Sequence, residues 1–176
     1  GIELGPGEPV GLITYMRTDS VSLAQEALDE IRTYIKDKYG ADNLPNEPRI
    51  FKTKSKNAQE AHEAVRPTSV NHEPAAIKSH LSKDQNRLYD LIWKRTVACQ
   101  MADARKQRVS ITIEGGGATF TASGTSIEFE GFLRAYVEGS DNPEAELANK
   151  ERILPQVKPD DPLSASSLDP KSHTTQ

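Results

Sequence analysis

The sequence is poor in cysteine and in long apolar runs, and each scarcity excludes a class of protein. Its 176 residues contain one cysteine, Cys99, which rules out an internal disulfide and a thiolate metal cage. No apolar stretch approaches the ~18 residues that cross a bilayer, and no basic-then-apolar signal segment follows Gly1. These absences predict a soluble protein of the reducing cytoplasm that has no membrane partner.

An excess of positive charge is also missing. The sequence has 22 Lys and Arg against 26 Asp and Glu, a formal net charge of -4, which argues against gripping nucleic acid through bulk positive potential. The charge is uneven, because residues 10–105 hold 15 basic and 13 acidic side chains whereas residues 106–176 hold 7 and 11. Four basic residues run without an intervening acid: Arg49, Lys52, Lys54 and Lys56. Such a run can follow a phosphate backbone or form a solvated loop, and the sequence leaves both interpretations open.

Residues 10–104 are predicted to form a mainly helical unit that follows a short end segment, residues 1–9. The first strong helix is expected to begin at a capping box formed by Ser22 and Gln25, because a Gln three residues after a Ser can bond back to it. Apolar residues then follow helical spacing until Gly40, a typical helix stop. The pattern therefore predicts one amphipathic helix early in the chain.

Three more elements are expected in this unit. Residues 10–14 predict a buried strand or turn, and residues 57–65 predict a short helix that ends before Pro67. A second capping box, Ser82 with Gln85, predicts the start of another helix. The apolar residues of that helix are Leu88, Leu91, Ile92, Val97 and Met101.

Residues 105–176 are predicted to be rich in β-structure, so the fold class expected for the whole chain is α+β. Apolar and polar residues alternate over 109–122 with a break at the glycines of 115–117, which is typical of a hairpin. Residues 127–137 and 152–157 offer further strand material. Large apolar side chains are few, so this part is expected to need additional chain to close a core.

The segment 14–20 places a phenol, a guanidinium, three aliphatic hydroxyls and a carboxylate just before a helix. In a structural interpretation Tyr15 lies at the edge of the core, Asp19 or Ser20 caps the helix and Arg17 makes a surface ion pair. In a chemical interpretation Tyr15 attacks phosphorus. Free phenols titrate near about pH 10, so this role needs a cation to favour phenolate and to neutralise developing charge, and Arg17 can do both.

A second polar segment, 59–67, contains His62. A second histidine four residues further on is missing, so the helical zinc-protease pattern fails and no metal ligands are expected. If this segment is helical, His62 and Arg66 share a face and can both reach a phosphate. The alternative is a solvated helix face of mixed charge.

Together, residues 11–20 (GLITYMRTDS) and 58–67 (AQEAHEAVRP) resemble the active-site tyrosine motif and the histidine motif of type IA bacterial DNA topoisomerases. Residues 88–95, 98–101 and 152–155 are also similar to that family. The resemblance covers nearly the whole chain. It implies a tyrosine-bearing helical domain, residues 10–104, followed by part of a β-rich hinge domain, residues 105–176.

The resemblance also implies roles for individual residues. Tyr15 is expected to attack single-stranded DNA and hold the break as a 5′-phosphotyrosine while another strand passes, which relaxes negative supercoils. Arg17 is expected to polarise the scissile phosphate and His62 to donate a hydrogen bond to a nearby phosphate. Thr18 and Arg66 are weaker candidates for DNA contact.

The family carries further parts that these residues do not supply. By resemblance, a TOPRIM domain that binds Mg²⁺ and a C-terminal DNA-binding domain of the same parent chain are expected as partners, and the isolated 176 residues are expected to be inactive. No ATP is expected, because the covalent bond to tyrosine conserves the energy of the phosphodiester. The location implied is the cytoplasm, in association with the nucleoid.

Two other functions remain open from the sequence. A non-catalytic module that binds single-stranded nucleic acid can use Tyr15 only to stack on a base. A structural interaction domain needs neither Arg17 nor His62 for any contact with DNA.

Overall fold

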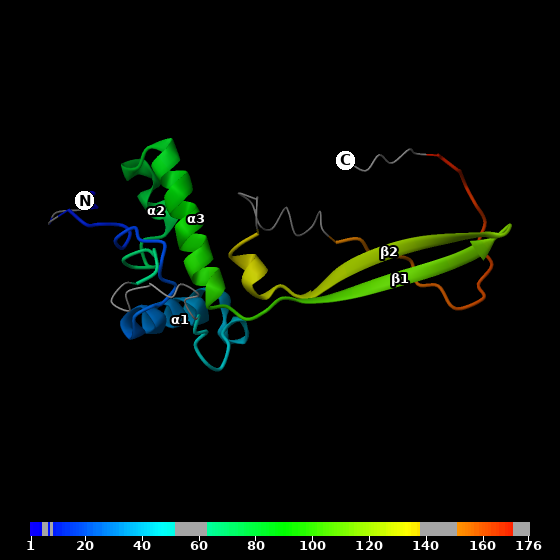
Figure 1. Ribbon diagram of the computed structural model, residues 1–176, viewed down its shortest axis with the longest axis horizontal. Coiled ribbons are helices and arrows are strands. Elements are labelled where there is room, and N and C mark those ends of the chain that lie inside the picture. Colours follow the sequence, from blue (N-terminus) through cyan, green and yellow to red (C-terminus); the bar gives the residue numbers. More distant parts are fainter. Residues whose placement is uncertain (5–6, 8, 52–62, 138–150, 171–176) are drawn as a thin grey trace.

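The chain forms a helical body from which a long β-hairpin extends (Figure 1). The computed structural model describes residues 1–176 except 5–6, 8, 52–62, 138–150 and 171–176. The helices and turns are α1 (Gln25–Tyr39), η1 (Ala41–Asn43), α2 (Pro74–Ile77), η2 (Lys78–His80), α3 (Lys83–Cys99) and η3 (Gly131–Arg134). The strands are β1 (Arg105–Gly115) and β2 (Ala118–Phe129). The α+β fold class expected from the sequence is confirmed.

The core of the helical body lies between α1 and α3. Ile35 of α1 and Val97 of α3 have no exposed surface. The Trp93 ring meets the Tyr34 ring edge to face, with centroids 5.5 Å apart, and its indole N–H donates to the Val70 carbonyl at 2.9 Å. Buried aromatic pairs of this kind combine a large apolar area with a satisfied polar atom. They fix α1, α3 and the segment before α2 against one another.

Helix α1 ends as its sequence predicts but begins differently. Gly40 adopts a φ of 93° and its N–H bonds to the Lys36 carbonyl at 3.1 Å, which closes the last turn. The capping box expected at Ser22 is wrong, because the helix starts at Gln25 and no side chain of its own segment caps it. Instead the Ala24 N–H donates to the Glu63 carboxylate at 2.7 Å. A residue 39 positions away therefore takes the place of a local cap.

Helix α3 confirms the second capping box. The Gln85 N–H donates to Ser82 Oγ at 3.3 Å, and the Ser82 N–H donates to Gln85 Oε1 at 3.0 Å. Val97 is buried, whereas Leu88 and Leu91 are 57% and 44% exposed. The buried stripe of α3 is instead formed by Tyr89, Trp93, Thr96, Val97 and Ala98.

The two segments expected to lead into the polar motifs are extended rather than regular. Residues 10–14 make single antiparallel bridges, Ile2 to Val10 and Ile13 to Pro67, in place of a continuous strand. The helix expected over 57–65 is absent at residues 63–65, and its earlier part lies outside the described residues. Instead, the Ala64 N–H and the Arg66 carbonyl bond to Ser22 and Thr14, outside this segment.

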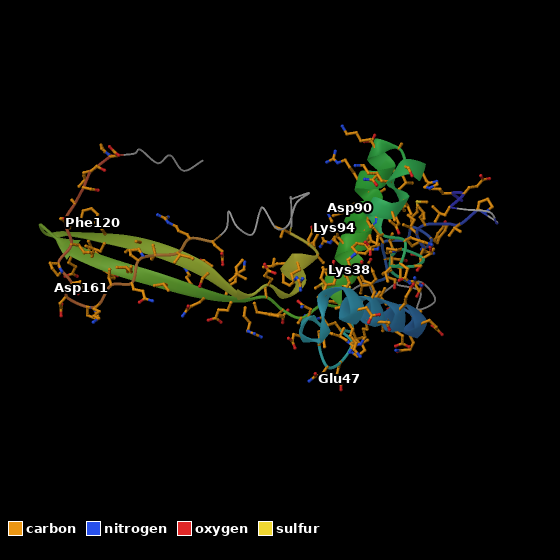
Figure 2. The ribbon with its side chains drawn as sticks, turned by 180° about the vertical axis from the view of Figure 1, so that it is seen from behind. Lys38, Glu47, Asp90, Lys94, Phe120 and Asp161 are labelled. Carbon is orange, nitrogen blue, oxygen red and sulfur yellow. The ribbon has the colours of Figure 1, made fainter. Side chains whose placement is uncertain are left out.

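The hairpin is confirmed, and two glycines make its turn. Strands β1 and β2 pair antiparallel up to Gly115 and Ala118. Gly116 and Gly117, between them, have φ of 60° and 80°, the positive values that a two-residue turn matching strand twist requires. Figure 2 shows Phe120 and Asp161 at the hairpin, far from the helical body.

The other expected strands are mostly wrong. Strand β2 ends at Phe129, and residues 131–134 form η3 instead of continuing it. Residues 152–157 contact the hairpin through one bridge, Thr125 to Arg152. Gly124 permits this crossing, because a Cβ there would collide with the Arg152 carbonyl and with Leu154.

The chain returns from the hairpin to the helical body at η3. The Phe132 N–H donates to the Ala102 carbonyl at 2.9 Å, and the Arg134 guanidinium donates to the Tyr39 carbonyl at 3.0 Å. Ala135 is buried in the same apolar cluster as Ile35. Both ends of the hairpin are therefore attached to the helical body.

Gly131 is the residue at which this return is most constrained. It has a φ of 52°, and a Cβ there would lie 2.5 Å from the Ala102 carbonyl oxygen. We expect Gly131→Ala to lower the free energy of unfolding by about 2–4 kcal/mol, because it combines backbone strain with a clash against main chain. Urea unfolding of the chain measures this. The control is Gly11→Ala, which meets nothing within 4 Å and is expected to change stability by less than about 0.5 kcal/mol. Equal stability of both variants would contradict the expectation.

Candidate functional site

The two polar motifs lie side by side although about fifty residues separate them. The Thr14 N–H donates to the Arg66 carbonyl at 2.9 Å, and the Thr68 N–H donates to the Leu12 carbonyl at 3.0 Å. These bonds flank the single bridge between Ile13 and Pro67. The residue just before Tyr15 is thus paired with the segment just after His62.

The Thr14 side chain reinforces this pairing. Its Oγ1 donates to the Ala64 carbonyl at 2.9 Å and accepts from the Arg66 N–H at 3.0 Å. A threonine hydroxyl has one donor and can accept at the same time, so both functions of this group are used. The side chain locks residues 64–66 against the segment that carries Tyr15.

Glu63 ties the same segment to the start of α1. One carboxylate oxygen accepts from the Ala24 N–H at 2.7 Å and the other from the Arg66 guanidinium at 2.9 Å. The Ala64 N–H donates to the Ser22 carbonyl at 2.8 Å. Thr14, Glu63 and Arg66 are called the clasp below, because together they join the tyrosine segment, the segment after His62 and α1.

Tyr15 projects from the clasp toward solvent. Its side chain is 78% exposed, and the neighbouring Met16 is 74% exposed. The Tyr15 carbonyl accepts from the Arg17 N–H at 2.9 Å, which turns the chain directly after the tyrosine. This exposure is the opposite of the core-edge position that the structural interpretation of Tyr15 requires, and it leaves the ring accessible to a large ligand.

The residues after Tyr15 hold a charged pair at the surface. The Arg17 guanidinium lies 3.0 Å from the Asp19 carboxylate, with the two side chains 41% and 31% exposed. Ser20 is buried, and its Oγ accepts from the Ser22 N–H at 3.2 Å, so this turn ends before α1 begins. Thr18 is exposed. The ion pair expected for Arg17 is present, and the cation still reaches solvent beside Tyr15.

The other two residues singled out in the sequence differ in placement. His62 lies outside the described residues. The Arg66 side chain is only 14% exposed, and besides Glu63 it donates to the Pro67 carbonyl at 2.9 Å. Its guanidinium is therefore directed at acceptors within the protein.

A small cavity of about 220 Å³ lies between the residues that lead into α1 and residues 49–51, and no sequence pattern predicts it. It is lined by Val21, Ser22, Leu23, Leu28, Arg49, Ile50 and Phe51. Val21, Ile50 and Phe51 are 42%, 73% and 44% exposed. Exposed apolar side chains that gather at one place mark an interaction surface. The lining residues come from segments far apart in sequence, which is why composition alone could not reveal them.

Arg49, on the wall of this cavity, is held by the helical body. Its N–H donates to Gln100 Oε1 at 3.0 Å, and Gln100 Nε2 donates back to its carbonyl at 2.9 Å. Its guanidinium lies 2.8 Å from Asp103. Gln100 is completely buried, and its side-chain amide holds the backbone of Arg49 in place through these two hydrogen bonds.

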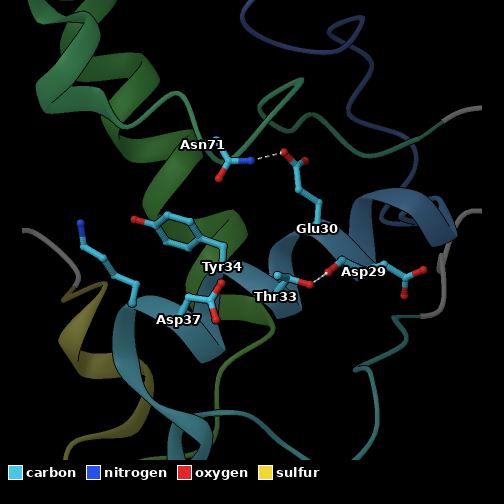
Figure 3. A pocket seen from close by; sticks show the side chains of 7 residues that line it. Asp29, Glu30, Thr33, Tyr34, Asp37 and Asn71 are labelled. Carbon is cyan, nitrogen blue, oxygen red and sulfur yellow. Dashed lines mark hydrogen bonds between the residues drawn. The ribbon is translucent and has the colours of Figure 1, made fainter.

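A second cavity, of about 500 Å³, is lined by α1 and by Asn71 (Figure 3). Beside it the Tyr34 phenol donates to Glu73 at 2.8 Å, and so does Lys38 Nζ. The hydrogen bond from Lys38 lowers the pKa of Glu73, whereas burial raises the pKa of the Tyr34 phenol. Tyr34 therefore stays protonated as a structural donor, unlike a tyrosine placed for attack.

Two kinds of feature are absent from the described residues. No group of three or more His, Cys, Asp or Glu side chains there is arranged to hold a metal ion. No helix in that part of the chain is long and apolar enough to cross a membrane.

Comparisons of sequence and of structure with known proteins all find DNA topoisomerases. A protein-family model described as DNA topoisomerase matches residues 8–176. DNA topoisomerase 1 of Xylella fastidiosa (strain Temecula1) is 48% identical over 177 residues, which cover 100% of this chain and 22% of that protein. DNA topoisomerase 1 of Synechococcus elongatus is 50% identical over 166 residues, 94% of this chain and 19% of that protein.

A solved structure is also similar. The full-length topoisomerase I of Thermotoga maritima matches with a TM-score of 0.66 and 26% sequence identity, over 90% of this chain and 23% of that chain. The chain thus spans about a fifth of the length of the curated relatives that it matches.

Proposed function

Because the chain belongs to the DNA topoisomerase family, we propose that Tyr15 is the nucleophile with which a type IA enzyme breaks one DNA strand. The phenol oxygen bonds to phosphorus, the phenol proton is lost, and the 3′ oxygen of the neighbouring nucleotide leaves as a hydroxyl. The product is a 5′-phosphotyrosine. Its reversal restores the strand without ATP, after another strand has passed and negative supercoils have relaxed.

The observation that carries this proposal is the position of Tyr15. Tyr15 is 78% exposed, at the end of a segment whose backbone is fixed by hydrogen bonds on the preceding residue, Thr14. A nucleophile that meets a polymer needs an accessible reactive atom on a support that does not move. A tyrosine used for packing has its ring covered, as Tyr34 and Tyr89 do.

Arg17 supplies the charge that this reaction needs. Its guanidinium is partly exposed two residues after Tyr15, with Asp19 at 3.0 Å. Contact with the scissile phosphate stabilises the extra negative charge that develops on phosphorus oxygens during attack. Asp19 orients the guanidinium from the protein side.

His62 is proposed to donate a hydrogen bond to a phosphate next to the cleaved one, and Thr18 to contact the DNA from the exposed turn. Arg66 is the fourth candidate for DNA contact. It can take that role only by releasing Glu63 and the Pro67 carbonyl, to which it now donates. Its direct contact with DNA is therefore the least supported of the four.

Single-stranded DNA is the proposed substrate, and the cavity between residues 21–23 and 49–51 supports it. Val21, Ile50 and Phe51 expose apolar surface there, next to the Arg49 guanidinium. Unpaired bases expose ring faces, and stacking on an aromatic side chain contributes about 1–3 kcal/mol per base. Duplex DNA keeps these faces covered.

The complete reaction is proposed to belong to a longer protein, since the chain spans 22% of the Xylella relative. In that protein a TOPRIM domain supplies Mg²⁺ and a C-terminal domain binds more DNA. Within the chain, residues 1–9 are proposed as the end of an upstream strand, 10–104 as the tyrosine domain and 105–176 as part of the hinge domain. We expect no relaxation from the isolated 176 residues, and relaxation by them would contradict this division. The proposed location is the cytoplasm, at the nucleoid.

The test of the proposed function is transfer of label from DNA to protein. The full-length protein is incubated with Mg²⁺ and a single-stranded oligonucleotide, labelled at either the 3′ or the 5′ end, and denatured rapidly. We expect label on the peptide containing Tyr15 from the 3′-labelled strand only, because the cleaved strand stays attached through its 5′ phosphate. Binding without transfer would favour the alternative, a non-catalytic module for single-stranded nucleic acid. Transfer to another peptide would exclude Tyr15.

A further inference from the structure

We propose that the clasp residues Thr14, Glu63 and Arg66 are positioning residues for the cleavage step, which fix where the Tyr15 phenol stands. The inference rests on the proposed role of Tyr15 as nucleophile. It also assigns Arg66 to Glu63 rather than to the DNA.

The first reason is that Thr14 lies between the part of the segment that packs on the core and the exposed Tyr15. Residues 11–15 join the segment after His62 through one isolated bridge, Ile13 to Pro67, and not through a sheet. Tyr15 and Met16 are themselves mostly exposed. Leu12 is buried in the core and accepts from the Thr68 N–H at 3.0 Å, so the hydrogen bonds at Thr14 are the last described bonds to residues 64–68 before the exposed Tyr15.

The second reason is the way in which Thr14 is used. Its hydroxyl bonds both to the Ala64 carbonyl at 2.9 Å and to the Arg66 N–H at 3.0 Å. The backbone of Thr14 donates to the Arg66 carbonyl at 2.9 Å. These three hydrogen bonds fix the position of Thr14 relative to residues 64–66. Thr14 immediately precedes Tyr15, so they also limit where Tyr15 can lie.

The third reason is that Glu63 links this arrangement to a rigid element. Its carboxylate takes the Ala24 N–H at 2.7 Å, where α1 begins, and α1 is anchored in the core by Ile31 and Ile35. The Arg66 guanidinium, at 2.9 Å, orients the carboxylate for that bond. Loss of either partner removes or misdirects the side-chain bond to Ala24, while the backbone bond from the Ala64 N–H to the Ser22 carbonyl and the apolar contacts of the core remain.

The consequence is kinetic. A displacement of about 1 Å at a reacting group can cost on the order of a hundredfold in rate. The binding of DNA through several contacts is much less sensitive to such a displacement. The clasp is therefore expected to affect the rate of cleavage much more than the affinity for DNA.

The first experiment compares Thr14→Val with Thr14→Ser in the full-length protein. Valine keeps the branched shape and removes both side-chain hydrogen bonds, whereas serine keeps the hydroxyl. In single-turnover reactions with Mg²⁺ and saturating 3′-labelled single strand, we expect Thr14→Val to form the Tyr15 adduct about tenfold to a hundredfold more slowly. DNA affinity is expected to stay within about twofold and Thr14→Ser to restore most of the rate, since only the hydroxyl is lost in valine.

The matched control is Thr33→Val. Thr33 Oγ1 also donates one hydrogen bond, to the Asp29 carbonyl at 2.8 Å, but within α1. We expect wild-type rates from this variant. Wild-type rates from Thr14→Val would overturn the inference, and so would a loss of rate that follows the fraction of unfolded protein and is not rescued by serine.

The second experiment separates the two roles of Arg66. If Arg66 contacts a phosphate, Arg66→Gln reduces by about one the slope of log affinity against log salt. If Arg66 instead acts within the clasp, we expect Arg66→Gln to leave this slope unchanged and to lower the rate of adduct formation. The clasp also predicts that Glu63→Gln has a similar defect and that the double variant is no slower than either single one, because the two residues act as a unit. A reduced slope or additive effects would overturn this assignment.

These outcomes are separable from failure of the proposed function. If the wild-type protein forms no adduct at Tyr15, the proposed nucleophile is wrong and the clasp loses its role with it. If the wild type forms the adduct and Thr14→Val forms it equally fast, only the clasp is wrong.

Discussion

Tyr15→Phe in the full-length protein is expected to abolish the covalent adduct with single-stranded DNA while changing DNA affinity by less than about twofold, because stacking of the ring survives the loss of its hydroxyl. No other group can replace the phenol oxygen that bonds to phosphorus. The measurement pairs rapid denaturation and gel analysis of a 3′-labelled oligonucleotide with a binding titration of the same strand. Tyr15 is 78% exposed, so the substitution leaves the core intact.

The control for this variant is Tyr136→Phe. Tyr136 packs against the core near the base of the hairpin, and its hydroxyl lies 3.2 Å from the Arg95 guanidinium. Tyr136→Phe also removes a phenol oxygen, but one that lies away from the tyrosine segment. We therefore expect this variant to form as much covalent adduct as the wild type. An equal amount of adduct from Tyr15→Phe and the wild type would show that Tyr15 only stacks or supports the surface.

Arg17→Ala is expected to slow adduct formation by about 100- to 1,000-fold, the size of effect seen when one donor to a developing oxyanion is removed. The guanidinium lies two residues after Tyr15 and is 41% exposed, so it can turn toward a bound phosphate. Single-turnover adduct formation at saturating DNA measures this effect separately from binding. A fall in affinity alone, with an unchanged rate at saturation, would contradict it.

Asp19→Asn distinguishes this role from a structural ion pair. Asp19 is the carboxylate 3.0 Å from Arg17. If the pair matters only for the local fold, loss of either partner has the same small effect, since exposed pairs contribute about 0–1 kcal/mol. If Arg17 acts on the phosphate, Arg17→Ala is far slower than Asp19→Asn. Similar rates for the two variants would favour the structural interpretation.

Elements whose determinants are close in sequence could be predicted. The capping box of α3 needs only Ser82 and Gln85, three residues apart, and it forms as expected. The hairpin turn needs only Gly116 and Gly117, which supply positive φ at no steric cost. In both places the local pattern and the tertiary structure agree.

The errors have long-range causes. The same kind of capping box does not form at Ser22, because the helix begins only at Gln25 and the backbone of residues 22–24 is bonded to Glu63 and Ala64. Leu88 and Leu91 fit a helical apolar pattern but lie on the exposed side of α3, since the larger Tyr89 and Trp93 occupy the buried side. A single sequence does not say which of two apolar faces packs inward.

The candidate site shows the same division. Tyr15 and Arg17 were identified from one short motif. The partners of Thr14 could not be, because Ala64 and Arg66 come about fifty positions later and meet it only in the fold. The amide of Gln100 that holds Arg49 was missed for the same reason.

The hairpin has a mechanical consequence. Strand β1 has 11 residues, which at about 3.3 Å per residue makes a ribbon about 36 Å long. Both of its ends are attached at the helical body, through Ala102 on one side and η3 on the other. A tilt of about 10° at this base would carry the tip through about 6 Å, on the strand length just given. Any tilt of the hairpin at its base is thus magnified at its tip, where 10° gives a displacement somewhat larger than the spacing of about 4.8 Å between paired strands.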